Sequence, residues 1–291
     1  MKQNPEFIVP AETALLPFLL DCLSHKSRNH VKGILKRGQV SVDGKICTAH
    51  AQPLRPGQRV HVLLHVPLAH EKLPFPLLYE DDDILVVDKP AGLLSISTGK
   101  EQEKTAYRLV NEYSKIQSPP GRAFIVHRLD RETSGVLLLA KNERVKQILQ
   151  DNWEEAALRR GYIALVEGKV QPAQNRIVSW LKQTKTLLMY SSSRKDDGKL
   201  AITNYKVLQA DENYSLLEIS LETGRKNQIR VHMKDIGHPV AGDKKYGAQT
   251  DPLERLALHA NVLIVKHPVT GEEMRFEAAV PGSFIKIFES L

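Results

Sequence analysis

Apolar positions near the start of the chain repeat with the period of a helix. One set falls on a single face and predicts a short amphipathic helix, formed by Ala14, Leu15, Phe18, Leu19 and Cys22. A second helix is expected to begin after Ser27, a candidate N-cap, and to end at Gly38. Its two faces differ: Val31, Ile34 and Leu35 lie on one, and Arg28, Lys32 and Lys36 on the other.

After Gly38 apolar and polar residues alternate, which is the pattern of half-buried strands. Val40 and Val42 lead to Asp43-Gly44, a strong signal for a two-residue hairpin turn. A last alternating strand, Val60, Val62 and Leu64, follows the turn at Pro56-Gly57. We therefore expect residues 1–66 to form a small domain of two helices followed by a small sheet.

Residues 67–76, PLAHEKLPFP, contain three prolines and are interpreted as a linker, because proline has no N–H for a sheet and restricts the residue before it. Beyond it the pattern predicts short strands at 84–87, 124–126, 136–139, 162–166, 216–219 and 263–265, and helices at 105–114 and 142–157. Strands and helices mix without a regular βαβ alternation. Residues 77–291 are therefore expected to form an α+β domain with a mixed, mostly antiparallel sheet.

The overall composition is that of an ordinary globular protein. The 291 residues suffice for two domains, and 42% are hydrophobic and 26% charged. No apolar run reaches the roughly 18 residues of a membrane span, and the N-terminus lacks a signal-peptide pattern. Cys22 and Cys47 are the only cysteines, which excludes a disulfide framework or a zinc pattern. These features favour a cytoplasmic location and no membrane partner.

The net charge of +7 is concentrated in one short part of the chain. Between Cys22 and His65 there are eight cations and a single acid, Asp43, so this segment carries the whole excess; the cations are Lys26, Arg28, Lys32, Lys36, Arg37, Lys45, Arg55 and Arg59. A basic block confined to one end is typical of a module that binds a polyanion. A merely solvated basic face is the alternative that charge alone leaves open.

The stretch VHRLDRETSG, residues 126–135, is a highly charged turn between two apolar strands. Its one aspartate, Asp130, has Arg128 and Arg131 close by in sequence. Neighbouring guanidinium groups favour an ionised carboxylate, which suits a nucleophile or an electrostatic stabiliser better than a general acid. Taken alone, the pattern fits an arginine–aspartate pair that only neutralises a turn at least as well.

The complete stretch HRLDRETSG resembles the HRLDxxTSG signature of the RluA/RluD-type pseudouridine synthases. That family isomerises uridine in RNA to pseudouridine, so the resemblance implies an RNA partner, no metal and no cofactor. The aspartate of the signature is the family's catalytic residue, and the resemblance assigns this role to Asp130.

Further segments resemble the family's other motifs in the same order. Residues 81–94, DDDILVVDKPAGLL, are similar to the family's first motif. The three aspartates that begin this segment lack the spacing of a calcium-binding loop. Residues 160–168, RGYIALVEG, are similar to the motif whose tyrosine stacks on the target base, here Tyr162, although a tyrosine at a strand start is more often a core residue. Residues 221–233, LETGRKNQIRVHM, are similar to T-G-R-x-H-Q-[IL]-R, whose last arginine partners the catalytic carboxylate, here Arg230. GHPVAGDKKYG, LHA and HPVTGEEMRF extend the resemblance over residues 73–291.

The resemblance implies a catalytic set of Asp130, Tyr162 and Arg230. It also implies a substrate-binding set of Lys89, His127, Arg128, Thr133, Arg225 and Asn227. Position 227 departs from the family, which usually has histidine there. Both side chains donate hydrogen bonds, but asparagine does not titrate near neutrality. We expect catalysis to survive this change, with an altered local contact to RNA.

The N-terminal pattern, with SVDGK in its hairpin, resembles the α-L RNA-binding fold of ribosomal protein S-four. This second resemblance implies an RNA-binding face made of Arg28, Lys32, Lys36 and Arg37. We expect a monomer, and ribosomal RNA is favoured over transfer RNA as the substrate.

A uridine inside folded RNA must be extruded before a side chain reaches its sugar–base bond. Arg128 is expected to fill the vacated space or hold a phosphate, Tyr162 to stack on the base, and Asp130 to act on the bond. Attack on the sugar, attack on the ring and removal of a sugar proton all remain open. Two other functions fit the sequence less well: a non-catalytic RNA-binding protein has no need of the Asp130–Tyr162–Arg230 trio, and a glycoside hydrolase requires a second carboxylate.

Overall fold

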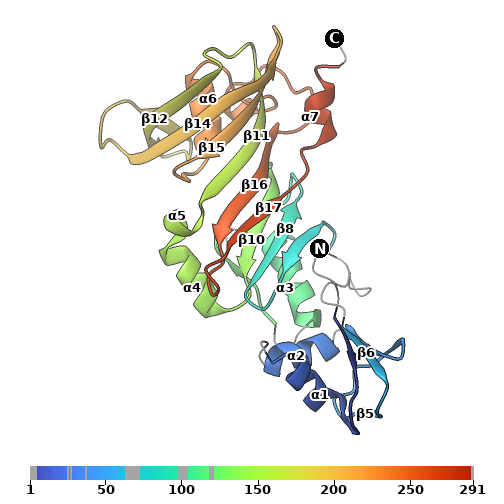
Figure 1. Cartoon of the computed structure of the whole chain (residues 1–291). Coiled ribbons are helices and arrows are strands. Elements are labelled where there is room, and N and C mark those ends of the chain that lie inside the picture. Colours follow the sequence, from blue (N-terminus) through green and yellow to red (C-terminus); the bar gives the residue numbers. More distant parts are fainter. Residues whose placement is uncertain are drawn as a thin grey trace. The chain divides into compact units, whose positions relative to one another are not determined.

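The structure, a computed structural model, describes residues 5–24, 26, 28–36, 38–62, 73–97, 104–117 and 121–289, with only the backbone described at Asn29, His30 and Lys36. The chain forms two compact units (Figure 1). The first comprises Met1–Lys72 and Tyr113–Gly121, and the second comprises Leu73–Glu112 and Arg122–Leu291. The division at Lys72 falls within the expected linker, 67–76, of which residues 67–72 lie outside the described part.

The first unit contains two helices and a small antiparallel sheet. The helices are α1 (Leu15–Cys22) and α2 (Arg28–Lys36). A four-stranded sheet has the order β1 (Glu6–Ile8), β6 (Arg59–Val62), β3 (Val40–Val42) and β4 (Lys45–Ile46), and β2 (Thr13–Ala14) pairs with β5 (Pro53–Leu54). Both helices and the β3 and β6 strands were expected from the apolar pattern.

The predicted hairpin in this unit is confirmed by its backbone. Asp43 and Gly44 have φ of 49° and 80°, as a tight turn between β3 and β4 requires. The apolar faces of both helices meet the sheet in one core that includes Leu19, Val31 and Leu35. The predicted cap Ser27 and the strand residue Leu64 lie outside the described part of the chain.

The second unit is built on an eleven-stranded sheet. Its main path has the order β13-β12-β14-β15-β11-β16-β10-β8-β7, β17 also pairs with β16, and β9 with β10. Among the described strands only β10 and β16 run parallel, so the predicted mixed, mostly antiparallel sheet is confirmed. The strands are β7 (Leu77–Glu80), β8 (Ile84–Lys89), β9 (Phe124–Ile125), β10 (Ser134–Ala140), β11 (Arg159–Glu167), β12 (Gln174–Gln183), β13 (Met189–Ser192), β14 (Lys199–Ala210), β15 (Tyr214–Leu221), β16 (Leu258–Lys266) and β17 (Glu273–Glu277).

Helices cover this sheet at both ends of the unit (Figure 1). Helix α6 packs in a core formed with β11 and β15, and α4 packs in another formed with β8, β10 and β16. The helices of this unit are α4 (Glu143–Asp151), α5 (Trp153–Ala156), α6 (Gln228–Asp235) and α7 (Gly282–Lys286), with a 3-10 turn η1 (Lys244–Tyr246). Helix α3 (Ala106–Gln117) belongs to this unit as far as Glu112 and to the first unit from Tyr113 on. No helix in the described part of the chain is long and apolar enough to cross a membrane.

Two elements differ from the sequence prediction. The helix expected over 142–157 is two helices, α4 and α5, which are separated at Asn152. The strand expected to be buried at 124–126 is the two-residue, half-buried β9. The long β12 and β14 strands and the four-residue β13 were not predicted. In β12 and β14 the apolar residues stand side by side, as in Ile177-Val178 and Val207-Leu208, and do not alternate strictly with polar ones.

The parallel pairing of β10 with β16 fixes the start of β10. Ser134 lies opposite His259 and Gly135 opposite Ala260. Gly135 has φ +114°, and a Cβ there would lie 2.1 Å from the Ala260 carbonyl oxygen, so only glycine fits. The Ser134 hydroxyl lies 2.8 Å from His259 Nδ1 and accepts a hydrogen bond from Arg255. This packing holds in place the charged turn that precedes β10.

Candidate active site

Asp130 lies in the turn between β9 and β10 and lines a cavity of about 320 Å³. Nine residues were predicted to be catalytic or substrate-binding, and seven of them line this cavity: Arg128, Asp130, Thr133, Tyr162, Arg225, Asn227 and Arg230. They come from the charged turn, from β11 and from the loop that leads into α6. The structure thus brings together three segments that are distant in sequence.

The Asp130 carboxylate has two polar neighbours. The Asn227 amide donates a hydrogen bond of 2.5 Å to Asp130 Oδ2, and Arg230 Nη1 lies 3.6 Å from the same oxygen. The expected proximity of Arg230 is present, but Asn227 makes the closer contact. Both neighbours orient the carboxylate, since one donates a hydrogen bond and the other carries a positive charge.

Arg230 is itself held by a second aspartate. Its Nε and Nη2 donate bidentate hydrogen bonds of 2.6 and 2.7 Å to Asp243, whose side chain is fully buried. Although burial opposes the charge, the hydrogen bonds and charge of Asp243, and more weakly the charge of Asp130, raise the pKa of Arg230. The bidentate pair fixes the plane of the guanidinium, so Nη1 is the group that faces Asp130.

Asn227 adopts a conformation that few residues tolerate. It caps α6 with φ 54°, in the left-handed region where asparagine is enriched. Its Oδ1 accepts a hydrogen bond of 3.2 Å from the Tyr246 hydroxyl, and the Tyr246 ring lies 4.9 Å from the Arg230 guanidinium. We expected position 227 to contact RNA, whereas its amide bridges Tyr246 and the Asp130 carboxylate.

Tyr162 lies on β11 and is half-buried. Burial raises the pKa of its hydroxyl to about 12; the Arg160 charge opposes this rise, and the Asp130 charge adds a smaller contribution to it. The side chain therefore remains a neutral phenol at physiological pH, and its ring is able to stack on a base without carrying charge.

The loop between β15 and α6 is clamped by a buried glutamine. Gln228 Oε1 accepts hydrogen bonds from Thr223 Oγ1 and Arg225 N, and its amide donates to Ile202 O and Thr203 Oγ1. Every polar atom of this amide is thus satisfied. The clamp ties the loop to β14 and positions Asn227 and Arg230 at the start of α6.

Two predicted substrate-binding residues lie elsewhere. Lys89 is fully buried, and its ammonium group donates to the carbonyls of Pro90, Leu93 and Arg131. Burial lowers its pKa to about 8. Lys89 therefore ties the turn after β8 to the Asp130 turn and has no donor left for a further carbonyl or phosphate.

His127 has a similar structural environment. Its Nε2 accepts a hydrogen bond from the Leu138 amide, and its ring stacks on Trp153 with centroids 4.7 Å apart. Burial, together with the Arg160 charge, lowers the pKa of His127 to about 3, so it is neutral. It lines a second, neighbouring cavity and not the cavity that contains Asp130.

Sequence reasoning gave no role to Asp243 or Tyr246. Both belong to GHPVAGDKKYG, which contributed to the family resemblance only as a string. In the sequence Asp243 is followed by two lysines and a tyrosine, a pattern that favours a solvated turn. Only the fold shows that Asp243 points inward to Arg230.

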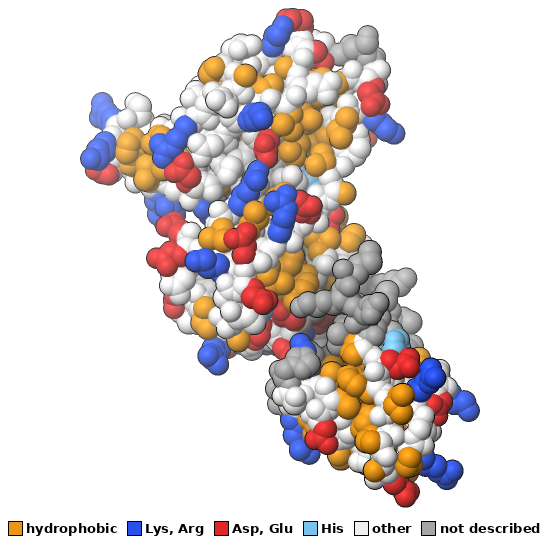
Figure 2. Space-filling view, in the orientation of Figure 1, with side chains coloured by type: hydrophobic (Ala, Val, Ile, Leu, Met, Phe, Trp, Pro, Cys, Tyr) orange, Lys and Arg blue, Asp and Glu red, His pale blue; other side chains and the backbone are white. Residues whose placement is uncertain are grey.

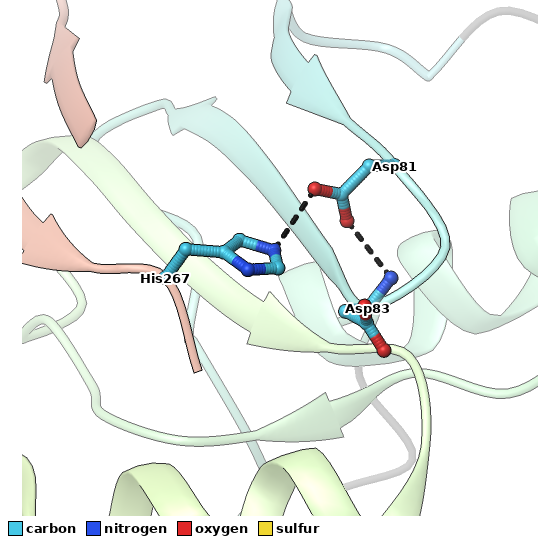
Figure 3. A group of neighbouring side chains, drawn as sticks. All are labelled: Asp81, Asp83 and His267. Carbon is cyan, nitrogen blue, oxygen red and sulfur yellow. Dashed lines mark hydrogen bonds and ion pairs between the residues drawn. The ribbon is translucent and has the colours of Figure 1, made fainter. Parts of the chain in front are cut away.

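One group of side chains has the composition of a metal site. Asp81, Asp83 and His267 lie together where the β7–β8 turn meets the end of β16 (Figure 3). His267 Nδ1 accepts from the Thr270 amide, so Nε2 carries the proton and donates to Asp81 at 3.1 Å, and the Tyr79 hydroxyl donates to the same carboxylate. These hydrogen bonds connect the β7–β8 turn to the turn after β16, so the cluster has a structural role.

Three residues of the expected RNA-binding face, Arg28, Lys32 and Lys36, lie on α2. The Arg28 side chain is exposed and that of Lys32 is half-exposed, and the apolar residues of α2 face the core. The side chain of Lys36 is not described, and Arg37 lies outside the described residues.

On the second unit, lysine and arginine side chains are interspersed with acids in the face shown by Figure 2. This mixture accords with the near-neutral net charge of the second unit.

Comparisons with known proteins show the family of the chain. The family model for RNA pseudouridylate synthase matches residues 83–235, more than half of the chain, and includes Asp130, Tyr162 and Arg230. The chain belongs to the RNA pseudouridylate synthase family. It is an isomerase that forms pseudouridine in RNA.

Relatives of this synthase extend over nearly the whole chain. An uncharacterized RNA pseudouridine synthase of Bacillus subtilis, YlyB, is 36% identical over 282 residues, which cover 94% of this chain and 92% of the relative. A ribosomal large subunit pseudouridine synthase D of Haemophilus influenzae is 31% identical over 293 residues, with 94% and 89% covered. The solved human RNA pseudouridylate synthase domain containing 4 has a similar fold, with a TM-score of 0.60, 22% identity, and coverage of 73% of this chain and 91% of that one.

Proposed function

We propose that this synthase modifies uridine in large-subunit ribosomal RNA, with Asp130 as the catalytic carboxylate. The observation that carries the assignment is the position of Asp130 in a cavity beside Asn227, Arg230 and Tyr162. Relatives named as ribosomal large subunit synthases support the choice of RNA. A ribosomal substrate also accords with a cytoplasmic location.

In this proposal the target nucleotide leaves its helix and its base enters the cavity. The neutral phenol of Tyr162 stacks on the base, an interaction worth roughly 1–3 kcal/mol. Arg128, exposed at the mouth of the cavity, faces the RNA from which the nucleotide has left. Extrusion is needed because the sugar–base bond of a stacked, paired uridine is shielded from side chains.

Asp130 then acts on the bond between sugar and base. Asn227 and Arg230 orient its carboxylate, and both stabilise a negative charge without titrating near neutrality. The uracil is retained, turns and rejoins the sugar through carbon 5, which loses its proton to solvent while the released ring nitrogen gains one. Its retention requires a closed site, because water would hydrolyse a glycosyl intermediate.

We further propose that the first unit is an S-four-like domain that adds affinity for RNA through α2. Its support is the amphipathic helix with Arg28 and Lys32 outside and Val31 and Leu35 inside. The domains of this proposal are residues 1–66 and 77–291, joined by the linker at 67–76, and the protein acts as a monomer without cofactor.

The substrate is tested in cells. Deletion of the gene is expected to remove specific pseudouridines from large-subunit ribosomal RNA, and the wild-type gene, but not an Asp130→Asn version, restores them. Loss of pseudouridine from transfer RNA alone would overturn the ribosomal assignment and leave the enzyme class intact.

A further inference from the structure

A second cavity, of about 600 Å³, adjoins the one that contains Asp130. The two share five lining residues: Arg128, Tyr162, Leu221, Gly224 and Arg225. Beyond this shared wall the second cavity is lined by the stacked pair of His127 and Trp153 and by Arg160. No role has been given so far to this cavity or to Arg160.

Arg160 is a buried cation without an ion-pair partner in the described part of the chain. The residue is only 8% exposed, Nη2 donates to the Glu222 carbonyl, and Nε has no hydrogen-bond partner among the described residues. Burial lowers its pKa, and the nearby Arg225 lowers it further, although Tyr162 and Glu154 act in the opposite direction.

The backbone next to Arg160 is shaped around the guanidinium. A Cβ at Gly224 would lie 2.9 Å from Arg160 Nη1, and Gly224 lines both cavities. Because residue 224 has no side chain, the Arg160 guanidinium is able to lie next to the wall that the two cavities share. Arg128 and Arg225, which belong to that wall, bring two more cations to the same place.

A buried and unpaired charge costs several kcal/mol, so its usual partner is an anion that arrives with a ligand. Guanidinium groups fit phosphate oxygens particularly well, because their planar donors bind them in a bidentate manner. A nucleotide that enters the first cavity stays bonded to the chain through phosphates on both sides. The guanidinium groups at the shared wall offer hydrogen-bond donors for one of these phosphates.

We propose that the second cavity binds a phosphodiester adjacent to the target uridine, with Arg160 as its anchor. This inference rests on the proposed function, since the first cavity must hold the target nucleotide. His127 is neutral there and stacks on Trp153, so the pair forms a rigid wall. Three acids line this cavity and are exposed to solvent: Asp151, Glu154 and Glu155. The Glu154 carboxylate lies 3.8 Å from the Arg225 guanidinium. In the proposed complex the phosphate takes the place of Glu154 beside Arg225.

The test compares Arg160→Gln with Arg159→Gln in the full-length protein. The control removes the same charge from the neighbouring position of β11, where Arg159 faces the other side of the sheet and pairs with Glu218. Binding of an unmodified large-subunit ribosomal RNA transcript is measured over a series of salt concentrations. Arg160→Lys, which keeps the charge, is included.

Arg160→Gln is expected to weaken RNA binding about tenfold and to reduce the slope of log K against log salt by about 0.7 to 0.9, the value for one lost phosphate contact. Arg159→Gln should retain the wild-type slope, and Arg160→Lys should recover most of it. Without RNA, the thermal midpoint of Arg160→Gln should be no lower than that of the wild type, because a buried charge without an ion-pair partner has been removed.

Equal slopes for Arg160→Gln and Arg159→Gln would overturn the inference. So would a lowered thermal midpoint with an unchanged slope, which identifies Arg160 as a structural residue. Pseudouridine formation by the wild-type protein is measured on the same transcript. Its absence would count against the proposed ribosomal substrate, whereas activity with equal slopes would count against the phosphate site alone.

Discussion

At the scale of single residues, the site is a chain of polar contacts that ends at Asp130. Asp243 orients Arg230, Tyr246 orients Asn227, and both oriented groups point to one carboxylate oxygen. Asp243 is fully buried, so the arrangement depends on a residue that never reaches the substrate. The contacts make separate predictions for orientation and for stability.

Asp243→Asn is expected to leave the Arg230 charge without its partner. Loss of one member of a buried ion pair costs about 3–5 kcal/mol in the free energy of unfolding. We expect the kcat for pseudouridine formation to fall while the KM for RNA changes little, because Arg230 loses its orientation toward Asp130. Urea unfolding and steady-state kinetics measure both effects.

Asp197→Asn is the matched control, since Asp197 pairs with Lys182 at a half-exposed site. Exposed pairs contribute less than about 1 kcal/mol. If Asp243→Asn proves as stable and as active as this control, the proposed role of Asp243 is wrong.

His232 makes a prediction about acid. It is buried between Ser179 and Thr203, and burial lowers its pKa to about 4. The unfolded chain therefore binds more protons than the folded protein between pH 6.5 and about 4. The free energy of unfolding should fall by about 3 kcal/mol on this account as the pH is lowered through that window.

This effect is measured as the difference in urea unfolding between pH 7 and pH 4.5 for the wild type and His232→Gln. The variant should lose less stability on acidification, and His50→Gln, at an exposed site, should behave as the wild type. An equal loss in all three proteins would show that His232 is not responsible.

At the scale of elements, the site depends on the junction of β10 and β16. The pairing of Gly135 with Ala260 fixes where β10 begins, and Lys89 ties the turn after β8 to the Asp130 turn from the other side. The charged turn is therefore rigid because three strands converge on it. This explains why the T-S-G part of the signature accompanies the aspartate.

Gly135→Ala is expected to disrupt this junction. Its Cβ would lie 2.1 Å from the Ala260 carbonyl oxygen, and φ is +114°. Gly271→Ala is the control, because Gly271 has φ +73° but no atom near its Cβ, so only backbone strain of about 1–2 kcal/mol applies. Gly135→Ala should destabilise the protein by more than this control and should reduce activity in the folded fraction; an equal loss of stability would contradict the account of the junction.

Sequence reasoning located elements well where apolar residues were periodic. The helices of the first unit, the Asp43-Gly44 hairpin and the core strands β8, β10, β11, β15 and β16 were all expected from pattern. Strands β12 and β14 were not, since their apolar residues stand side by side and do not alternate strictly with polar ones. Sequence likewise supplied Asp130 and Arg230 through motifs, but the partnership of Arg230 with Asp243 exists only in three dimensions.

At the scale of the whole molecule, charge divides the chain into two parts. The first unit contains the net excess of cations, and the second unit contains the cavity. We expect affinity for RNA to reside partly in the first unit and the chemistry wholly in the second. This separation is testable without knowledge of how the units are arranged.

The double variant Arg28→Glu, Lys32→Glu is expected to raise the Kd for RNA and to flatten its salt dependence, because cations that neutralise phosphates are lost. The rate of pseudouridine formation on saturating RNA should be retained. Lys266→Glu, an exposed site on the second unit opposite Glu273, is the control for a change in total charge. An unchanged Kd in the double variant would refute an RNA-binding role for α2.

The central claim is that Asp130 performs the chemistry in the synthase. The most direct measurement is release of tritium from ribosomal RNA labelled at carbon 5 of uracil, with Asp130→Asn and the wild type compared at matched RNA occupancy. The wild type should release tritium, and the variant should lose more than about a thousandfold in rate, equivalent to about 4 kcal/mol, while still binding RNA. Tritium release by Asp130→Asn at the wild-type rate would contradict the account.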